Sequence, residues 1–221
     1  MQQKLNQAII EHAGLELWLL KEKAIWLPEL QTLLISDVHF GKAAHFRKSG
    51  IPIPEPIHDR DLELLASLFE QYSPTHVYFL GDLFHSDWNG QWSVLMQFLD
   101  QFEEVTFHLV LGNHDILSDD FYTDSRLQIH KEPVIYGALM LSHEPMDFVP
   151  EGLLNLCGHI HPGIRLRGLG RQSVRISCFF WEKQRLILPA FGNFTGLALM
   201  KAAPTAKIYG ITTEKVILIQ S

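Results

Sequence analysis

The stretch FLGDLFHSD, residues 79–87, places an acid and a histidine three positions apart at the end of an apolar run. The run HVYFL that leads into it has the length and composition of a buried strand. Gly81 and Asp82 offer a common way for such a strand to turn out of a sheet. A turn alone would explain Asp82, so the case for chemistry at Asp82 and His85 depends on the residues at the ends of the other strands.

Strands and helices alternate in the first half of the chain. LELWLL and AIWLP flank KEK as a predicted hairpin, and TLLISD, HVYFLGD and VTFHLVLGNHD are predicted strands. Helical spacing of apolar residues predicts amphipathic helices over 58–72 and 92–102. After about residue 125 only strands are predicted, in VIYGALMLSHEP, GLLNLCGHIHP, RQSVRISCFFW, RLILPAF and EKVILIQ. The pattern predicts an α/β fold with a sheet-rich second half.

Length and composition favour one domain over residues 1–221, because 221 residues with 47% hydrophobic content suffice for one substantial core. A net charge of −7 argues against a protein that coats nucleic acid through bulk electrostatics. Two cysteines cannot form a disulfide framework, and the first residues lack a signal-peptide pattern, so we expect a cytoplasmic protein. No apolar stretch approaches the roughly 20 residues of a membrane span, so no membrane partner is expected.

Polar residues follow five of the apolar runs. They are Asp37 and His39, Asp82, Asn113 and His114, His143, and His159 and His161. In extended chain, residues two apart point to the same side, so each D-x-H or H-x-H pair is predicted to direct two donor atoms at one point. Either pair alone fits a structural role. Five such segments together indicate one crevice at the carboxyl ends of the strands.

The residue types suit a catalytic metal site. Imidazole, carboxylate and amide ligands favour manganese, zinc or iron, and the lack of clustered cysteine argues against a structural zinc site. Seven candidate ligands are too many for one tetrahedral ion, but they suit two ions that share a carboxylate. We expect Asp82 to be the shared ligand.

The motif order D-x-H, G-D, G-N-H-D, H, G-H-x-H resembles that of the calcineurin-like metallophosphoesterase superfamily, over nearly the whole chain. DVHFGKAAHFRKSGIPIP (37–54), GHIHPGIRLRG (158–168) and LPAFGNFTG (188–196) are similar to the bacterial ligase-associated DNA damage response endonucleases of the PdeM type. GDLFH is also similar to the nuclease subunits of double-strand-break repair.

This resemblance implies a four-layer αββα sandwich with two mixed sheets and two divalent ions, most often Mn²⁺, with Zn²⁺ or Fe as alternatives. It assigns one ion to Asp37, His39, Asp82 and His161, and the other to Asp82, Asn113, His143 and His159. Two divalent ions would change the net charge from −7 to −3, which makes the protein less repulsive to phosphates.

The resemblance also makes His114 catalytic. In such sites the metals activate water and polarise the phosphoryl oxygens, and a histidine protonates the departing oxygen. Asp115 is expected to orient the His114 ring, the alternative being a turn or cap residue. His85 resembles a repair-nuclease histidine that assists at the scissile phosphate, the alternative being a hydrogen bond to a ligand carboxylate.

Two basic segments are candidate phosphate contacts. Lys42, Arg47 and Lys48 follow the first motif and are expected to reach a phosphate beside the metals, unless they form a solvated helix face. Four arginines surround the GLG turn after the last motif and are expected to form a basic hairpin that lines the cleft, unless they occupy an ordinary exposed strand face: Arg165, Arg167, Arg171 and Arg175.

The leading functional hypothesis is a metal-dependent phosphodiesterase, a nuclease acting on DNA ends or single strands, with DNA ligase and helicase partners implied by the family. Repair nucleases grip duplex through a separate capping domain, and 221 residues are nearly used up by the catalytic core, so no such domain is expected. The alternative is a small-molecule phosphoesterase for cyclic or dinucleoside phosphates. A third possibility, a binding scaffold like the metallophosphoesterase-fold subunit of retromer, is disfavoured by the complete ligand set.

Overall fold

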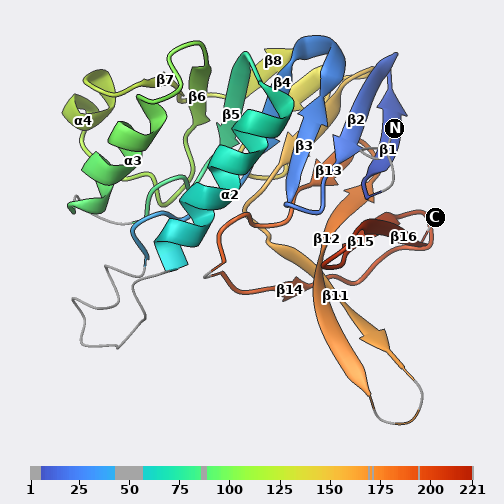
Figure 1. The fold of residues 1–221 in the computed structure, drawn as a ribbon. Helices are drawn as coiled ribbons and strands as arrows, with labels where there is room; N and C mark the ends of the chain where they lie inside the picture. Colours follow the sequence, from blue (N-terminus) through green and yellow to red (C-terminus); the bar gives the residue numbers. More distant parts are fainter. Residues whose placement is uncertain are drawn as a thin grey trace.

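The structure is a computed structural model that describes residues 6–42, 57–85, 89–168, 170, 172–193 and 195–220, and the side chains from residue 60 onward in the second of these ranges. Two β-sheets pack face to face, and helices cover the outer face of one of them (Figure 1). This arrangement confirms the expected α/β sandwich.

The first sheet has seven strands in sequence order. Neighbours are antiparallel from β1 to β4 and parallel from β4 to β7, so the sheet is mixed. Its strands are β1 (Ala8–His12), β2 (Leu15–Leu19), β3 (Ala24–Leu27), β4 (Thr32–Ile35), β5 (His76–Leu80), β6 (Thr106–Val110) and β7 (Leu127–His130). The predicted hairpin is β2 and β3, and the carboxyl ends of β4, β5 and β6 meet at one edge.

The second sheet is also mixed and has the order β14-β11-β12-β13-β10-β9-β8, with β15 paired to β12 and β16 paired to β15. Its strands are β8 (Val134–Tyr136), β9 (Leu139–Leu141), β10 (Leu154–Cys157), β11 (Pro162–Arg167), β12 (Ser173–Glu182), β13 (Arg185–Ile187), β14 (Ala198–Leu199), β15 (Lys207–Ile211) and β16 (Val216–Gln220). The predicted predominance of strands in the second half is confirmed.

The helices are α2 (Ile57–Tyr72), α3 (Gln91–Leu99), the short α4 (Asp119–Thr123) and the 3-10 turn η2 (Pro28–Leu30). The predicted helix over 58–72 matches α2, but the one over 92–102 ends at Leu99. Beyond it the backbone turns tightly, with the Phe102 N–H donating to Leu99 O at 3.1 Å. The Phe102 ring still packs on Phe69 at a centroid distance of 5.0 Å, which explains why its apolar spacing extends past the helix.

Two cores lie on opposite faces of the first sheet. Leu33 and Phe79 pack with α2 and α3, whereas Leu34 and Leu80 pack against the second sheet. Strands buried on both faces read as continuous apolar runs, which is why β4, β5 and β6 are visible in the sequence.

The outer face of the second sheet differs from the expected helical fourth layer. In the described part of the chain its core is small, and the irregular stretch 200–206 packs on it through Met200, Ala202 and Ala206. The sheet contributes Cys157 and Cys178 there. Short side chains let this irregular segment approach closely, so the described residues cover this face without a helix.

Three imidazoles form a row across β5, β6 and β7. His76 Nδ1 lies 3.1 Å from His108 Nε2, and His108 Nδ1 lies 3.2 Å from His130 Nε2. The ring of Tyr78 stacks on His108 at a centroid distance of 4.1 Å. Burial, followed by the charges of His130 and His76, lowers the pKa of His108 to about 4. The fold therefore holds this ring neutral.

We predict that His108 makes the protein less stable in acid. The unfolded chain binds a proton at this residue near pH 6.5, whereas the folded protein resists protonation down to about pH 4. The free energy of unfolding therefore falls as the pH drops through this window. Urea denaturation at pH 7 and pH 5 should show a smaller loss for His108→Gln than for wild type. Gln97→Ala, on the exposed face of α3, is the control and should follow the wild-type pH dependence. Parallel curves for His108→Gln and wild type would contradict the prediction.

Candidate metal centre

The loops that follow β4 and β5 continue side by side beyond the sheet. The N–H of Asp37 donates to Gly81 O at 3.2 Å, that of His39 to Asp82 O at 2.8 Å, and that of Phe40 to Leu83 O at 2.9 Å. Phe40 and Phe84 form a parallel bridge. The D-x-H and G-D motifs are thus bound to each other through their backbones, which fixes where their side chains point.

Five of the candidate ligands adopt a left-handed backbone. The φ angles are 54° at Asp37, 51° at His39, 51° at Asp82, 66° at His159 and 53° at His161. The expectation that each pair converges because its chain is extended is therefore wrong. The pairs converge through alternating left-handed residues instead, a conformation that costs of order 1 kcal/mol at each non-glycine position. Strain at so many polar residues is typical of a functional site.

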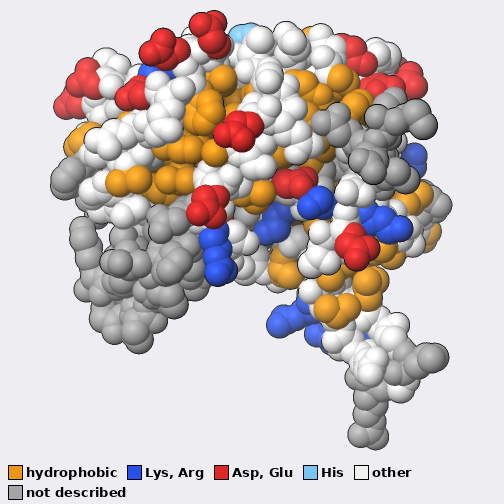
Figure 2. All heavy atoms as spheres, viewed as in Figure 1, with side chains coloured by type: hydrophobic (Ala, Val, Ile, Leu, Met, Phe, Trp, Pro, Cys, Tyr) orange, Lys and Arg blue, Asp and Glu red, His pale blue; other side chains and the backbone are white. Residues whose placement is uncertain are grey.

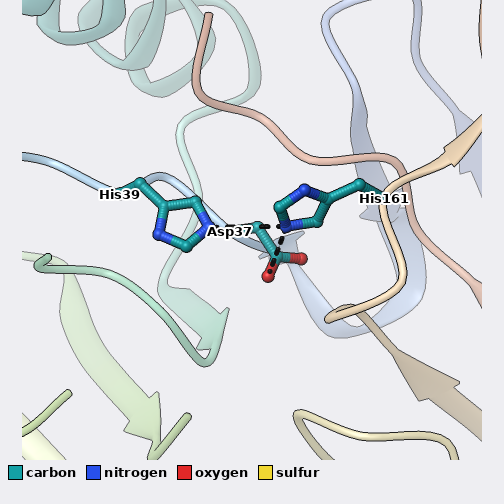
Figure 3. Close-up of side chains that lie close together, drawn as sticks. All are labelled: Asp37, His39 and His161. Atoms are coloured by element: carbon teal, nitrogen blue, oxygen red, sulfur yellow. Dashed lines mark hydrogen bonds and ion pairs between the residues drawn. The ribbon is translucent and has the colours of Figure 1, made fainter. Parts of the chain in front are cut away.

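The first donor cluster comprises Asp37, His39 and His161 (Figure 3). His161 Nε2 lies 3.2 Å from Asp37 Oδ1 and 3.4 Å from His39 Nε2. Asp82 Oδ2 lies 3.7 Å from the same His39 nitrogen. Asp37 also accepts hydrogen bonds from Ser36 Oγ and from the His159 N–H, at 3.0 Å for the latter. The structure thus brings together the four side chains of the first predicted ligand set.

The second donor cluster lies on the other side of Asp82. Asp82 Oδ1 is 3.5 Å from His143 Nε2. Asn113 Oδ1 is 3.0 Å from both His143 Nε2 and His159 Nδ1, and these two nitrogens are 3.1 Å apart. The two oxygens of Asp82 therefore face different clusters, as expected for a shared ligand. Asp37 also approaches this group, since its carboxylate, Asp82 and His143 offer donor atoms within 4.8 Å of one another.

The donor atoms of the second cluster suit a positive charge. His143 Nδ1 lies 3.0 Å from Leu80 O, so it carries the proton that it donates to that carbonyl. In the neutral ring Nε2 then has only a lone pair, and it faces the oxygen of Asn113, which is also an acceptor. Two lone pairs at this distance repel, and either a proton on Nε2 or a cation between or beside them removes the repulsion. The donor set therefore fits a metal ion.

The pKa values of the first cluster favour ligation. Burial opposes ionisation of Asp37, but the hydrogen bond and charge of His161 together with the Ser36 hydroxyl outweigh it, so the pKa of Asp37 lies below its usual range. Burial and the neighbouring Lys42 charge lower the pKa of His39 to about 3. A carboxylate and a neutral imidazole are the forms that bind a divalent ion.

Asp115 joins the loops that follow β5 and β6 through backbone hydrogen bonds. Its buried carboxylate accepts the N–H groups of Asp82 at 2.7 Å, Gly112 at 2.9 Å and Phe84 at 3.1 Å. Burial raises the pKa of Asp115 to about 7, although these donors act in the opposite direction. Among the hydrogen bonds of the described residues, none joins this carboxylate to the His114 ring. The structure thus shows the turn-residue alternative in place of the expected ring-orienting contact.

The family model of the calcineurin-like phosphoesterases matches residues 30–176. This chain belongs to the calcineurin-like phosphoesterases. Among solved structures, the nuclease MPE of Pseudomonas putida aligns with a TM-score of 0.78 and 28% identity, over 97% of this chain and 100% of that chain. The phosphoesterase Yfce of E. coli aligns with a TM-score of 0.46 and 15% identity, over 84% of this chain and 96% of that chain. No curated protein sequence matches significantly.

His114 and His85 lie beside the first cluster of this phosphoesterase. The half-buried His114 ring is 4.5 Å from the His85 ring and 5.5 Å from the His39 ring, between centroids. The His114 N–H donates to Asp82 Oδ1 at 2.8 Å, which fixes the residue relative to the shared ligand. His85 Nδ1 lies 3.3 Å from His39 Nδ1. This contact of His85 is with a candidate ligand imidazole, and it leaves His39 Nε2 facing His161 and Asp82.

The lysines and arginines predicted to contact phosphate lie in different parts of the structure. Lys42 is half-buried, and its ammonium interacts with Asp82 and Asp37, so it lies beside the donor clusters. Arg47 and Lys48 lie outside the described residues, as does Arg171. Arg165 is exposed on β11, four residues beyond His161. Arg167 and Arg175 are on the same hairpin.

Several residues that shape the site were not among the predicted ones. A Cβ on Gly112 would overlap the Asp82 carboxylate, and one on Gly158 would overlap Ser36 Oγ. The Phe191 N–H donates to Ser36 O at 2.9 Å, and Asn193 Nδ2 donates to Asp61 Oδ1 of α2 at 2.6 Å. The glycines stand directly before Asn113 and His159 in their motifs, and this was the available signal. Asp61, inside a helix, gave none.

We predict that Asp82→Asn removes both metals, whereas His159→Ala removes mainly one. Asp82 contributes an oxygen to each cluster, but His159 belongs only to the second. Wild type purified with Mn²⁺ should hold about two ions per chain by elemental analysis. His159→Ala should hold about one, and Asp82→Asn fewer still. Asp119→Asn, a surface carboxylate paired with Lys131, is the matched control and should keep both ions. Full occupancy in Asp82→Asn would contradict the shared-ligand assignment.

Proposed function

We propose that this phosphoesterase is a dimetal phosphodiesterase, a nuclease that cuts DNA at single strands or ends. The observation that carries the proposal is the division of the Asp82 carboxylate between two donor clusters, with the His114 ring fixed beside them. Family membership makes the protein a hydrolase of phosphoester bonds. The similar Pseudomonas putida protein is a nuclease, which supports the choice of substrate.

The roles of the side chains follow from their positions. Two divalent ions would supply Lewis-acid polarisation of the phosphoryl oxygens and activation of water at neutral pH. Asp82 holds the two clusters in register, and His143 is oriented by Leu80 O to present its Nε2. His114 can give a proton to the departing oxygen because its half-buried ring stands at the edge of the first cluster. Lys42 adds positive charge for the phosphate.

Recessed ligands favour a flexible strand as substrate. The side chains of His39, Asp82 and His143 are only 3–4% exposed. A scissile phosphate must therefore enter the loops to reach the metals, which a single strand or a strand end does at lower cost than an intact duplex.

We propose Mn²⁺ as the metal, with Zn²⁺ or Fe as alternatives, because the donors are carboxylate, amide and imidazole groups and include no thiolate. We also propose a cytoplasmic DNA repair role, with a DNA ligase and a helicase as partners. Cys157 and Cys178 are buried free thiols, as is common in reducing compartments. No described helix has the length and apolar character to cross a bilayer.

A small-molecule phosphoesterase is the second candidate. A cavity of about 310 Å³ adjoins the second cluster, and its lining includes Asn113, His143, Pro133 and Met146. Its apolar part would accommodate the base of a cyclic or dinucleoside phosphate whose phosphate lies at the metals.

We predict that His114→Ala keeps both metals but cuts single-stranded DNA about 10²- to 10⁴-fold more slowly, the usual contribution of a general acid. A nitrophenyl diester should lose less, because its leaving group needs little protonation. Initial rates would be measured with Mn²⁺ on labelled single-stranded and duplex DNA, a nitrophenyl diester and a nitrophenyl monoester. Wild type should favour diester over monoester and single strand over duplex.

The control for this experiment is His12→Ala, which changes an imidazole at the end of β1, away from the site. It should retain wild-type rates on all four substrates. Unchanged DNA cleavage by His114→Ala would exclude His114 as the proton donor. Absence of DNA cleavage together with rapid turnover of a cyclic or dinucleoside phosphate would overturn the nuclease proposal in favour of the second candidate.

A further inference from the structure

A β-hairpin projects from the body of the protein directly after the last metal motif (Figure 1). This arm consists of β11 and the first half of β12, residues 162–167 and 173–177. At its base, Pro162 and Gly163 pair with β14, and the Ala198 N–H donates to His161 O at 3.0 Å. The second half of β12 continues into the sheet, where Cys178–Trp181 pairs with β15. The base of the arm is therefore fixed to the sheet and to the segment that carries His161.

The register of the arm places its arginines on one face. Arg165 is directly opposite Arg175, and Arg167 is opposite Ser173. Directly opposed side chains lie on the same face, as do residues two apart in a strand, so the three arginines form one group. The other face is aliphatic and consists of Ile164, Leu166, Val174 and Ile176. Figure 2 shows basic side chains on one side of the projecting hairpin, bordering the hollow beneath the body.

The arginine face carries positive charge that the described residues do not neutralise. Arg165, Arg167 and Arg175 are exposed, and none of the ion pairs formed within the described ranges includes them. Like charges directly opposite each other in a sheet are destabilising. A chain with net charge −7 thus keeps an unfavourable arginine pair beside its metal centre. A bound anion would remove the repulsion, and paired guanidinium groups suit the oxygens of phosphate.

We propose that the arginine face of the arm binds the phosphate backbone of the same nucleic acid strand that is cut at the metals. This inference rests on the proposed nuclease function and adds where the uncut part of the strand runs. Arg165 is four residues beyond His161, which corresponds to about 13 Å of β-strand. The arm therefore contacts phosphates a few nucleotides from the cleaved bond.

The test compares a long single-stranded oligonucleotide with a dinucleotide that cannot reach the arm. Arg165→Gln/Arg175→Gln should raise KM for the long substrate about tenfold and leave kcat/KM for the dinucleotide unchanged. Binding of the labelled oligonucleotide, followed by fluorescence anisotropy without turnover, should weaken by a similar factor. The slope of log Kd against log salt concentration should fall by about 0.7 for each arginine removed.

Two variants serve as controls. Lys183→Gln/Lys215→Gln makes the same change in net charge at exposed turns outside the arm and should bind as wild type does. Arg165→Lys/Arg175→Lys keeps the charge and should retain most of the salt dependence. Removing the opposed arginines should not lower the melting temperature, since it relieves repulsion.

The possible results distinguish failure of the arm proposal from failure of the proposed nuclease function. Wild-type affinity and salt slope in the glutamine double variant would overturn the arm proposal, even if DNA is still cut. Equal binding of polyglutamate and of oligonucleotide by wild type would also overturn it, because the face would then not be matched to phosphates. Oligonucleotide binding that depends on the arginines, without any DNA cleavage by metal-loaded wild type, would instead refute the nuclease function.

Discussion

The division of one buried carboxylate between two donor clusters is the constraint on which the rest of the structure depends. Asp82 directs Oδ2 toward His39 and Oδ1 toward His143, and the His114 N–H holds the second oxygen. Each neighbour must approach a carboxylate that is almost without solvent, so small displacements would leave buried charge uncompensated. The two packed sheets make these precise positions possible, because loops that follow strands of both sheets converge on a single point. The arrangement explains how a chain of ordinary length supports a site with seven donors.

The loops reach that point at a conformational cost. Left-handed backbone at Asp37, His39 and Asp82 is unfavourable, and it persists because hydrogen bonds bind the loops to one another. Asp115 contributes three of these bonds without presenting its carboxylate to the site. Its sequence position beside His114 suggested chemistry, but its function in the structure is to fix the loops. Backbone hydrogen bonds also hold the arm in place, because its base is joined to His161 and β14.

Much of the fold was predictable because β4, β5 and β6 are buried on both faces and therefore stand out as apolar runs. Strands β1, β7 and β15 were not identified, since AIIEH contains polar residues, LQIH is short and KIYGI is interrupted by glycine. The ligand candidates were visible from their residue types and positions after strands, and the structure brings all seven together. The local geometry of D-x-H and H-x-H was predicted wrongly, because a positive φ depends on tertiary hydrogen bonds that a short motif does not reveal. The contacts of Asp115 and Asp61 join segments distant in sequence and were hidden for the same reason.

The central claim is that Asp82 is shared by two metal ions, and electron paramagnetic resonance of the manganese-loaded protein tests it most directly. Two Mn²⁺ ions bridged by one carboxylate are close enough to couple magnetically. Titration of the metal-free protein with Mn²⁺ should therefore give a coupled dinuclear spectrum as loading approaches about two ions per chain. The coupled signal should be absent from Asp82→Asn at the same added concentration of Mn²⁺, because this variant should hold fewer ions. A spectrum of isolated mononuclear ions at every loading of the wild-type protein would contradict the account.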